Sequence, residues 1–469
     1  MANEIAFLPV RELATRYAKK ELSPREVLAS SLSRIDAFEG AVNAFSFVDR
    51  KGAEAAAAQS EARWMKGEPL GPLDGVPATV KDIMYVRGWI TTYGSRVLAL
   101  GEPAAEDSPP VARLREAGAI LLGMTNTPEI GWKGHTDSPA HGITRNPWNL
   151  ARTPGGSSGG AAVAAALGIA PLNIGTDGGG SIRIPASFTG LFGFKASSGR
   201  VPAWPASAFG SMAHTGPITR TVEDGALMLN ALARPDSRDW LALPPDGVDY
   251  AAAMEGGVEG LKIAFSPTLG YLKVDEDVAT LVRQAAEKFA ALGAVVEEVD
   301  PGFPDPRRAR EVLWWSGAAY RTRHLTAAQR AQLDPGLREV VEEKAAALTL
   351  TDYMEAMQAR AELGTAMRRF HDRYDLLLTP ATPFTAYLAD HDGVDAATKQ
   401  RWTDRPSFTF PFNLTGQPAV SVPCGMTPDG LPAGLQIVGR IYDDITVMRA
   451  ARAWEAARPW GMPKEPARA

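Results

Sequence analysis

The amino-acid sequence predicts an α/β fold: one large domain, residues 1–469, in which α-helices cover both faces of a mixed, mostly parallel β-sheet. The chain is long enough to bury a large core, and its 45% hydrophobic and 22% charged residues are typical of a globular protein. Helical and extended segments alternate along most of its length, and no linker divides them. These observations favour a single domain.

The N-terminal segment, residues 1–70, is predicted to be helical. Ser23, Pro24 and Glu26 have the pattern of a capping box with proline at the first helical position, and an amphipathic stretch then reaches Phe38. A further helix is expected from Asp49, a residue type that favours helix N-termini.

Residues 71–225 are expected to hold the core of the sheet. The pattern predicts a strand at 76–84, then a helix that begins at Ser108-Pro109, and then a strand at 119–124. The longest uncharged run, residues 153–173, is dominated by Gly and Ala and broken by a proline, so it predicts a buried helix rather than a membrane span.

The second half of the chain continues the alternation. Residues 303–374 are predicted to form a helical insert that overhangs the sheet and shapes a pocket. The remaining expected elements are strands at 261–265, 294–299, 375–379, 419–423 and 435–438, a helix at 275–292, and a last helix from about residue 443.

Charge and targeting signals narrow the partners and the location. A formal net charge of −5 gives no support for binding to a nucleic-acid backbone. The N-terminus lacks the apolar region of a signal peptide, and no membrane span is expected, so the sequence predicts a cytoplasmic protein. The single cysteine, Cys424, has no partner for an internal disulfide and is expected to be a buried, inert thiol.

Two glycine-rich clusters between residues 153 and 183 each contain a candidate serine, Ser157 and Ser181. Glycines before a helix make a tight turn that binds an anion or presents a nucleophile. No lysine follows at the Walker position and neither cluster completes GxGxxG, so a phosphate site is disfavoured. A packing loop remains the alternative for either cluster alone, but together they favour serine chemistry.

A serine nucleophile needs a base, and none of the 6 histidines lies in a recognisable triad pattern. Lys81 ends an otherwise apolar predicted strand, where burial would lower the pKa of its ammonium group and leave a neutral amine. An exposed lysine at the end of a strand is the alternative interpretation of this motif alone.

Three motifs together resemble the amidase signature family: GVPATVKD around Lys81, TPGGSSGG around Ser157 and GTDGGGSIRIPASFTGLFGFK around Ser181. The separation between the two serines also matches. The resemblance continues through TNTPEIG, TRNPWN, GPITRTVED, PFNLTGQPAVSVP and GLPAGLQIVG, so it covers nearly the whole chain.

The resemblance implies that Ser181 is the nucleophile, Lys81 the base, and Ser157 a bridging serine that follows a cis peptide bond from Gly156. It also implies the amidase signature fold and a reaction that needs neither a metal nor an organic cofactor. The hydroxyl of Ser157 both donates and accepts hydrogen bonds, so it can take the proton of Ser181 while passing its own to Lys81.

The residues around Ser181 suggest supporting roles. Backbone N–H groups of Gly178, Gly179, Gly180 and Ser181 are expected to bind the oxyanion of a tetrahedral intermediate. Asp177 and Arg183 flank the nucleophile and are expected to hold its loop by an ion pair, with ordinary surface charges as the alternative. Ser158 is expected to support the loop around Ser157.

These features predict an amidase that hydrolyses a small-molecule carboxamide to a carboxylic acid and ammonia or an amine, with esterase side activity. Within the resemblance, the alternative is the glutaminase A subunit of a tRNA-dependent amidotransferase, which works with partner subunits. A non-catalytic protein that kept the fold is disfavoured because both serines and the lysine are present. The sequence leaves a homodimer open.

Aromatic residues in the segments that shape the acyl pocket of relatives favour an aryl or other apolar amide. Packing in the core or the helical insert is an equally good interpretation of each one. Arginines that converge on the pocket would instead indicate a small polar substrate. The candidate pocket residues are Met124, Trp204, Phe209, Trp314, Trp315 and Trp402, with Tyr320 and Phe384 beside them.

Overall fold

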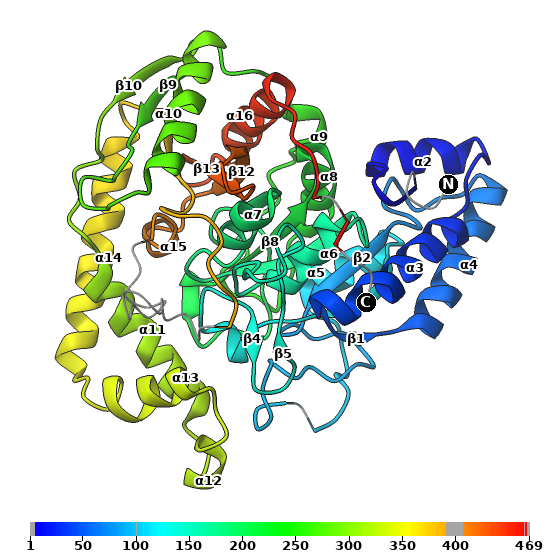
Figure 1. Cartoon of the computed structure of the whole chain (residues 1–469), viewed down its shortest axis with the longest axis horizontal. Helices are drawn as coiled ribbons and strands as arrows, with labels where there is room; N and C mark the ends of the chain where they lie inside the picture. Colours follow the sequence, from blue (N-terminus) through cyan, green and yellow to red (C-terminus); the bar gives the residue numbers. More distant parts are fainter. Residues whose placement is uncertain (1–4, 100, 391–406, 464, 467–469) are drawn as a thin grey trace.

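The computed structural model describes residues 5–99, 101–390, 407–463, 465 and 466. Its centre is an 11-stranded sheet, which Figure 1 shows running through the middle of the molecule. In sheet order the strands are β1 Phe45–Val48, β3 Ile120–Thr125, β2 Pro77–Lys81, β6 Leu172–Asp177, β8 His214–Thr219, β7 Phe192–Lys195, β12 Ala419–Met426, β13 Pro432–Gly439, β11 Leu376–Pro380, β9 Lys262–Phe265 and β10 Val295–Glu298.

The predicted mixed sheet is confirmed, but the prediction that it is mostly parallel is wrong. Among the described residues, four neighbouring strand pairs are parallel and six are antiparallel. Strand β8 returns beside β6 in the opposite direction, and a short turn joins β12 to β13 as an antiparallel hairpin. These pairing directions depend on contacts between strands that local sequence patterns do not specify.

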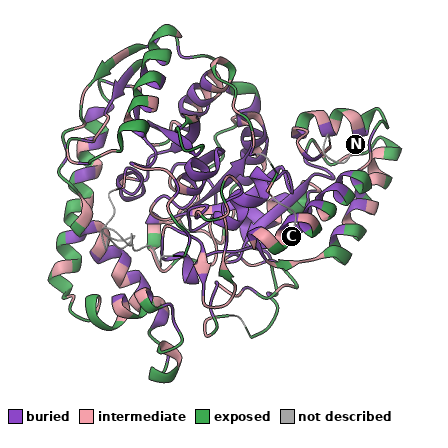
Figure 2. Ribbon diagram, in the orientation of Figure 1, coloured by how far each residue is buried: buried purple, intermediate pink, exposed green. Residues whose placement is uncertain are grey.

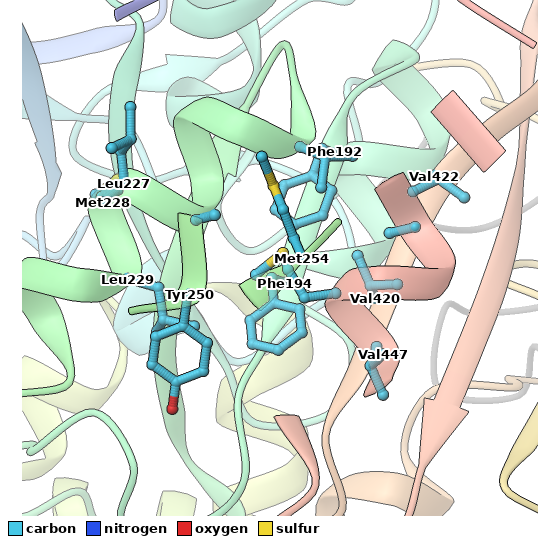
Figure 3. Packing of buried hydrophobic residues seen from close by; sticks show 14 of the residues in the cluster. Phe192, Phe194, Leu227, Met228, Leu229, Tyr250, Met254, Val420, Val422 and Val447 are labelled. Atoms are coloured by element: carbon cyan, nitrogen blue, oxygen red, sulfur yellow. The ribbon is translucent and has the colours of Figure 1, made fainter. Parts of the chain in front are cut away.

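Helices cover both faces of the sheet, because alternate residues of a strand point to opposite sides. Phe192 and Phe194 of β7 lie in one hydrophobic cluster with Val420 of β12 and side chains of α8 and α16 (Figure 3). Gly193, between the two phenylalanines, faces the other way. A Cβ on this glycine would lie 2.6 Å from the side chain of Ala186 in α7, so α7 packs directly against the second face.

The helices follow the predicted segments closely. The capping box of Ser23 and Glu26 is present, and the side chain of Asp49 caps the helix after it. The helices are α2 Val10–Ala18, α3 Pro24–Val42, α4 Arg50–Lys66, α5 Pro109–Glu116, α6 Gly159–Ala166, α7 Arg183–Thr189, α8 Val222–Leu232, α9 Tyr250–Ala253, α10 Glu276–Ala291, α11 Arg307–Thr322, α12 Ala327–Arg330, α13 Pro335–Glu339, α14 Leu350–Phe370, α15 Pro411–Leu414 and α16 Asp444–Ala457.

Two helical groups lie at opposite ends of the molecule in Figure 1. Helices α2, α3 and α4 form one group, beside the sheet edge that carries β1. Helices α11 to α14, from the predicted insert, form the other, with a π-helical turn at Val340–Lys344. Across the described residues, no helix combines the length and apolar character needed to cross a bilayer.

Burial is strongest in the centre of the molecule, where Figure 2 is mostly purple. Every residue of α6 is buried, which confirms the buried helix predicted from the Gly- and Ala-rich run. Cys424 of β12 is fully buried, and burial raises the pKa of its thiol to about 12. The thiol is therefore protonated and shielded from solvent in the folded chain.

Candidate active site

Three segments bring the predicted catalytic residues to one edge of the sheet. Lys81 is the last residue of β2, which runs parallel to β6 with Val80 opposite Ile174. Ser157 lies in the turn before α6, and Ser181 in the turn between β6 and α7. The ends of parallel strands meet at the same edge of a sheet, so the strand order explains why residues far apart in sequence meet here.

The amine of Lys81 lies among three hydroxyl groups. Its Nζ is 2.6 Å from Ser157 Oγ, 3.0 Å from Ser158 Oγ and 2.9 Å from Thr176 Oγ1. Ser158 Oγ also donates to the Thr176 carbonyl at 3.2 Å, so its own proton is already used. Ser158 thus links the lysine to β6, as a supporting residue does.

Lys81 is fully buried, with an exposed fraction of 0%. Burial lowers its pKa well below the ordinary value, although the negative charge of Asp177 acts in the opposite direction. An ammonium group loses its hydration on burial, so the uncharged amine is favoured there. The site therefore holds a lysine that can accept a proton.

The backbone around Ser157 is built for close approach. The Gly156–Ser157 peptide bond is cis. A Cβ on Gly156 would lie 2.7 Å from the backbone of His135, so only glycine fits at this position. Gly131 also lies against this serine, since a Cβ at Gly131 would be 3.1 Å from Ser157 Oγ. A larger residue at Gly156 would therefore clash with the His135 backbone, and one at Gly131 would crowd the Ser157 hydroxyl.

Asp177 and Arg183 form a fully buried ion pair beneath Ser181, with Nη2 and Oδ1 2.8 Å apart. Burial acts to raise the pKa of Asp177, but the charge and hydrogen bonds of Arg183 outweigh it and hold that pKa well below its ordinary value. The guanidinium also donates to Asn413 and Gln436, so it ties the loop of Ser181 to α15 and β13. The pair organises the loop that carries Ser181.

Replacing Arg183 by methionine is expected to lower the free energy of unfolding by about 3 to 5 kcal/mol, because it leaves the Asp177 carboxylate buried without its partner. Thermal melts of both proteins at pH 7 would measure the loss as a lower transition temperature. Arg369→Gln, at an exposed position of α14, is the control and should melt like the parent chain. An unchanged transition in Arg183→Met would contradict a structural role for the pair.

The predicted oxyanion donors need one correction. The N–H of Gly180 donates to Asp177 Oδ1 at 2.8 Å, so this donor stabilises the loop. Its neighbours face open space: Gly178 lines one cavity, Gly179 a second, and Ser181 lines both. The backbone N–H groups of these three residues remain the candidates for binding an oxyanion.

Two cavities meet at Ser181. The apolar cavity is open to solvent, has a volume of about 740 Å³ that includes the space at its opening, and is walled largely by apolar side chains, namely Trp132, Ile184, Phe188, Trp314, Phe384 and Phe410. The large cavity, also open to solvent, has a volume of about 1610 Å³ on the same measure, and Ser157 and Thr176 line it together with Ser181. Since the predicted nucleophile lies where they join, the two parts of a substrate can extend into different cavities.

Part of the predicted aromatic pocket is present. Trp204 and Phe209 line the large cavity, and Trp314 of α11 lines both cavities. The rings of Phe209 and Trp314 stack with their centroids 3.9 Å apart. Tyr320 lines the large cavity, and Phe384, which follows β11, lines the apolar one. The helical insert contributes to both walls through Trp314.

Two pocket predictions are wrong. Met124 of β3 is fully buried in the hydrophobic cluster beneath the sheet, because its strand position points away from the cavities. Trp315 packs among side chains of the helical insert, since it lies about 100° around α11 from its neighbour Trp314. The prediction for Trp402 falls outside the described residues.

Sequence reasoning did not single out Thr176 and Gly131, which touch the catalytic constellation. Both lie in motifs that carried the family resemblance, and the parallel register of β2 and β6 would have placed Thr176 beside Lys81. Gly131 lines both cavities.

His214 lines the large cavity, but its ring nitrogens lie 2.8 Å from the Met212 carbonyl and 3.1 Å from the Ser198 hydroxyl. Its neighbours therefore already occupy both nitrogens.

Comparison with known proteins identifies the family of the chain. A family model described as Amidase matches residues 26–448, which is most of the chain. The chain belongs to the amidase signature family. It is 38% identical to the acylamidase of Rhodococcus erythropolis, over 98% of this chain and 97% of the relative.

Other amidase signature proteins are similar over the same length. The A subunit of the glutamyl-tRNA(Gln) amidotransferase of Myxococcus xanthus (strain DK1622) is 36% identical, over 96% of this chain and 97% of that protein. Among solved structures, a bacterial aryl acylamidase of the amidase signature family superposes with a TM-score of 0.89 at 34% identity, covering 97% of each chain. The chain is an amidohydrolase of this family.

Proposed function

We propose that this amidase signature enzyme hydrolyses the C–N bond of a carboxamide through an acyl-enzyme formed on Ser181. The observation that carries the proposal is the buried amine of Lys81, 2.6 Å from Ser157 Oγ, because Ser157 lines a cavity that Ser181 also lines. A neutral amine in this position can draw a proton from Ser181 through Ser157. The products are a carboxylic acid and ammonia or an amine.

The hydrogen bonds around Lys81 set the direction of the relay. A neutral amine has two N–H donors and one lone pair. The hydroxyls of Ser158 and Thr176 accept the two N–H groups, and the lone pair then accepts the O–H of Ser157. Ser157 gives its proton to Lys81 as it takes the proton of Ser181, whose oxygen attacks the substrate carbonyl. One proton has moved to the lysine and one C–O bond has formed.

The relay then runs in reverse. The tetrahedral intermediate places its oxyanion against the N–H groups of Gly178, Gly179 and Ser181, where each such donor is worth about 3 to 4 kcal/mol of barrier. Ser157 protonates the leaving nitrogen and recovers its proton from Lys81, so the C–N bond breaks and the amine departs. A water molecule, deprotonated by the same pair, then attacks the acyl carbon. The C–O bond to Ser181 breaks, the serine oxygen takes back the proton through Ser157, and the carboxylic acid departs.

The apolar cavity supports an aryl or other apolar acyl group. Its walls of tryptophan, phenylalanine and isoleucine would bury such a group from water, with a gain of about 25 cal/mol per Å² of apolar surface. Among the described residues of its lining, two are cations, and both are already paired: Lys133 Nζ lies 2.5 Å from Asp137 and 2.6 Å from Asp334, and Arg310 faces Glu311. The cavity thus presents little unbalanced charge to an acyl group.

A panel of amides tests the proposal. The purified chain is incubated alone with aliphatic amides, anilides, amino-acid amides and glutamine, and released ammonia or amine is quantified. Turnover of simple amides that disappears in Ser181→Ala is the expected result. Amine release that is equal in the parent chain and in Ser181→Ala would overturn the mechanism.

The second candidate is the glutaminase component of a tRNA-dependent amidotransferase, which the 36% identity to the Myxococcus protein supports. In that case the panel would show no turnover by the chain alone, and glutamine cleavage would appear only after partner subunits are added. Adding such subunits to the same assay therefore separates the two functions.

A further inference from the structure

The charges that line the two cavities differ. The described residues around the large cavity include Arg321 and Arg323, both near the C-terminal end of α11, and no aspartate, glutamate or lysine. Burial lowers the pKa of Lys81 and that of His214 well below their ordinary values, which favours the uncharged form of each. The two guanidinium groups therefore give the large cavity a net positive charge.

Neither arginine is paired with a carboxylate in the described part of the chain. Arg321 rests over the ring of Tyr93, 4.4 Å from its centroid, and Arg323 over the ring of Tyr320 at 3.7 Å. Stacking uses the flat face of a guanidinium and leaves its N–H edge free to bind an anion. Arg323 donates one N–H to the Tyr320 carbonyl, so Arg321 has the more available edge.

The position of Ser157 assigns the two cavities to the two sides of the scissile bond. Ser157 must reach the leaving nitrogen to protonate it, and it lines the large cavity but is absent from the walls of the apolar one. The leaving amine therefore extends into the large cavity, and the acyl group into the apolar cavity. This assignment rests on the proposed function of Ser157.

We infer that the preferred substrates are N-acylated amino acids or related amides, with an apolar acyl group and a leaving amine that carries a carboxylate. Arg321, assisted by Arg323, binds that carboxylate at the mouth of the large cavity. A guanidinium offers paired donors that match a carboxylate, and its attraction also favours entry of an anionic substrate. The arginines are specificity residues, since they lie away from the reacting atoms.

Matched substrates test this inference. The phenylacetyl amides of glycine, β-alanine and 4-aminobutanoate are compared with those of ethylamine, propylamine and butylamine, which replace the carboxylate by a methyl group. For the best of the three carboxylate-bearing amides, we expect kcat/KM to exceed that of its neutral counterpart by about tenfold or more. One charge-assisted hydrogen bond has an effect of this size. Added NaCl should reduce this ratio, because the arginines are partly exposed.

The double variant Arg321→Gln with Arg323→Gln should bring the ratio close to one, mainly by raising KM for the anion, while the neutral amides keep their rates. Arg321→Glu should shift the preference to phenylacetyl amides of diamines. Arg369→Gln removes an arginine from α14 outside the cavity lining and should leave the ratio unchanged.

Two outcomes would overturn the inference. In the first, the parent chain shows similar kcat/KM for the anionic amides and for their neutral counterparts. In the second, the double variant keeps the same preference for the anionic amides as the parent chain. In either case Ser181-dependent turnover of the neutral amides would leave the proposed hydrolysis intact. If no amide shows Ser181-dependent turnover, the proposed function itself fails and the inference fails with it.

Discussion

Ser181→Ala is expected to lower kcat for amide hydrolysis by about 10⁴-fold or more, because it removes the oxygen that forms the acyl-enzyme in the proposed mechanism. The variant should fold normally, because alanine differs from serine only by the hydroxyl oxygen and Ser181, which is 7% exposed, borders two cavities. Steady-state rates on the best substrate of the amide panel would measure the loss, with circular dichroism as the check on folding.

A second readout locates the covalent step. An activated phenyl ester of the preferred acid should add one acyl mass to the parent chain and none to Ser181→Ala in intact-mass spectra. Ser46→Ala is the matched control: Ser46 lies on the edge strand β1, donates to the Met124 carbonyl and should not affect labelling. Acylation of the alanine variant at the parent rate would place the nucleophile elsewhere.

Lys81→Ala is expected to lower kcat/KM by about 10³-fold or more, because a positioned proton acceptor contributes on this scale and here also activates the nucleophile. Lys81→Arg should not restore activity, since a guanidinium remains protonated and has no lone pair for Ser157. Ser157→Ala should leave a slow residual rate, because water can partly replace a bridging hydroxyl. Equal activity of Lys81→Arg and the parent chain would exclude lysine as the base.

The pH dependence follows from the state of Lys81. Burial lowers its pKa, and only the neutral amine accepts a proton, so kcat/KM should be constant above that pKa and fall as the pH drops below it. A profile on a neutral amide between pH 5 and 10 measures this acid limb, and the residual rate of Lys81→Ala should lack it. An acid limb that persists unchanged in the alanine variant would assign the titration to another group.

Local signals in the sequence predicted most elements of the fold. The capping box at Ser23 and the cap at Asp49 fix helix starts by satisfying backbone N–H groups, and both helices begin there in the structure. The strand around Lys81 is shorter than predicted: it begins at Pro77 and ends at Lys81, where the chain turns into the site. The motifs that suggested the family also placed the lysine and both serines together.

Local sequence patterns did not predict the features that depend on contacts between distant segments of the chain. The antiparallel pairing of β6 with β8 joins strands separated by α7 and β7, and no local pattern encodes its direction. The side of a strand or helix that faces a cavity is set by packing, which is why Met124 lies in the core and Trp315 in the insert. The N–H of Gly180 could be assigned to Asp177 only once the loop geometry was known.

The single thiol of the chain has a consequence for experiments. Cys424 lies in the middle of β12, between β7 and β13, with a raised pKa and no exposed surface. A thiol reagent can reach it only when this central part of the sheet opens. The rate at which the reagent modifies Cys424 therefore measures how often this part of the native protein opens, and no engineered label is needed. A ligand that stabilises the closed state should lower that rate, so the rate also reports ligand binding.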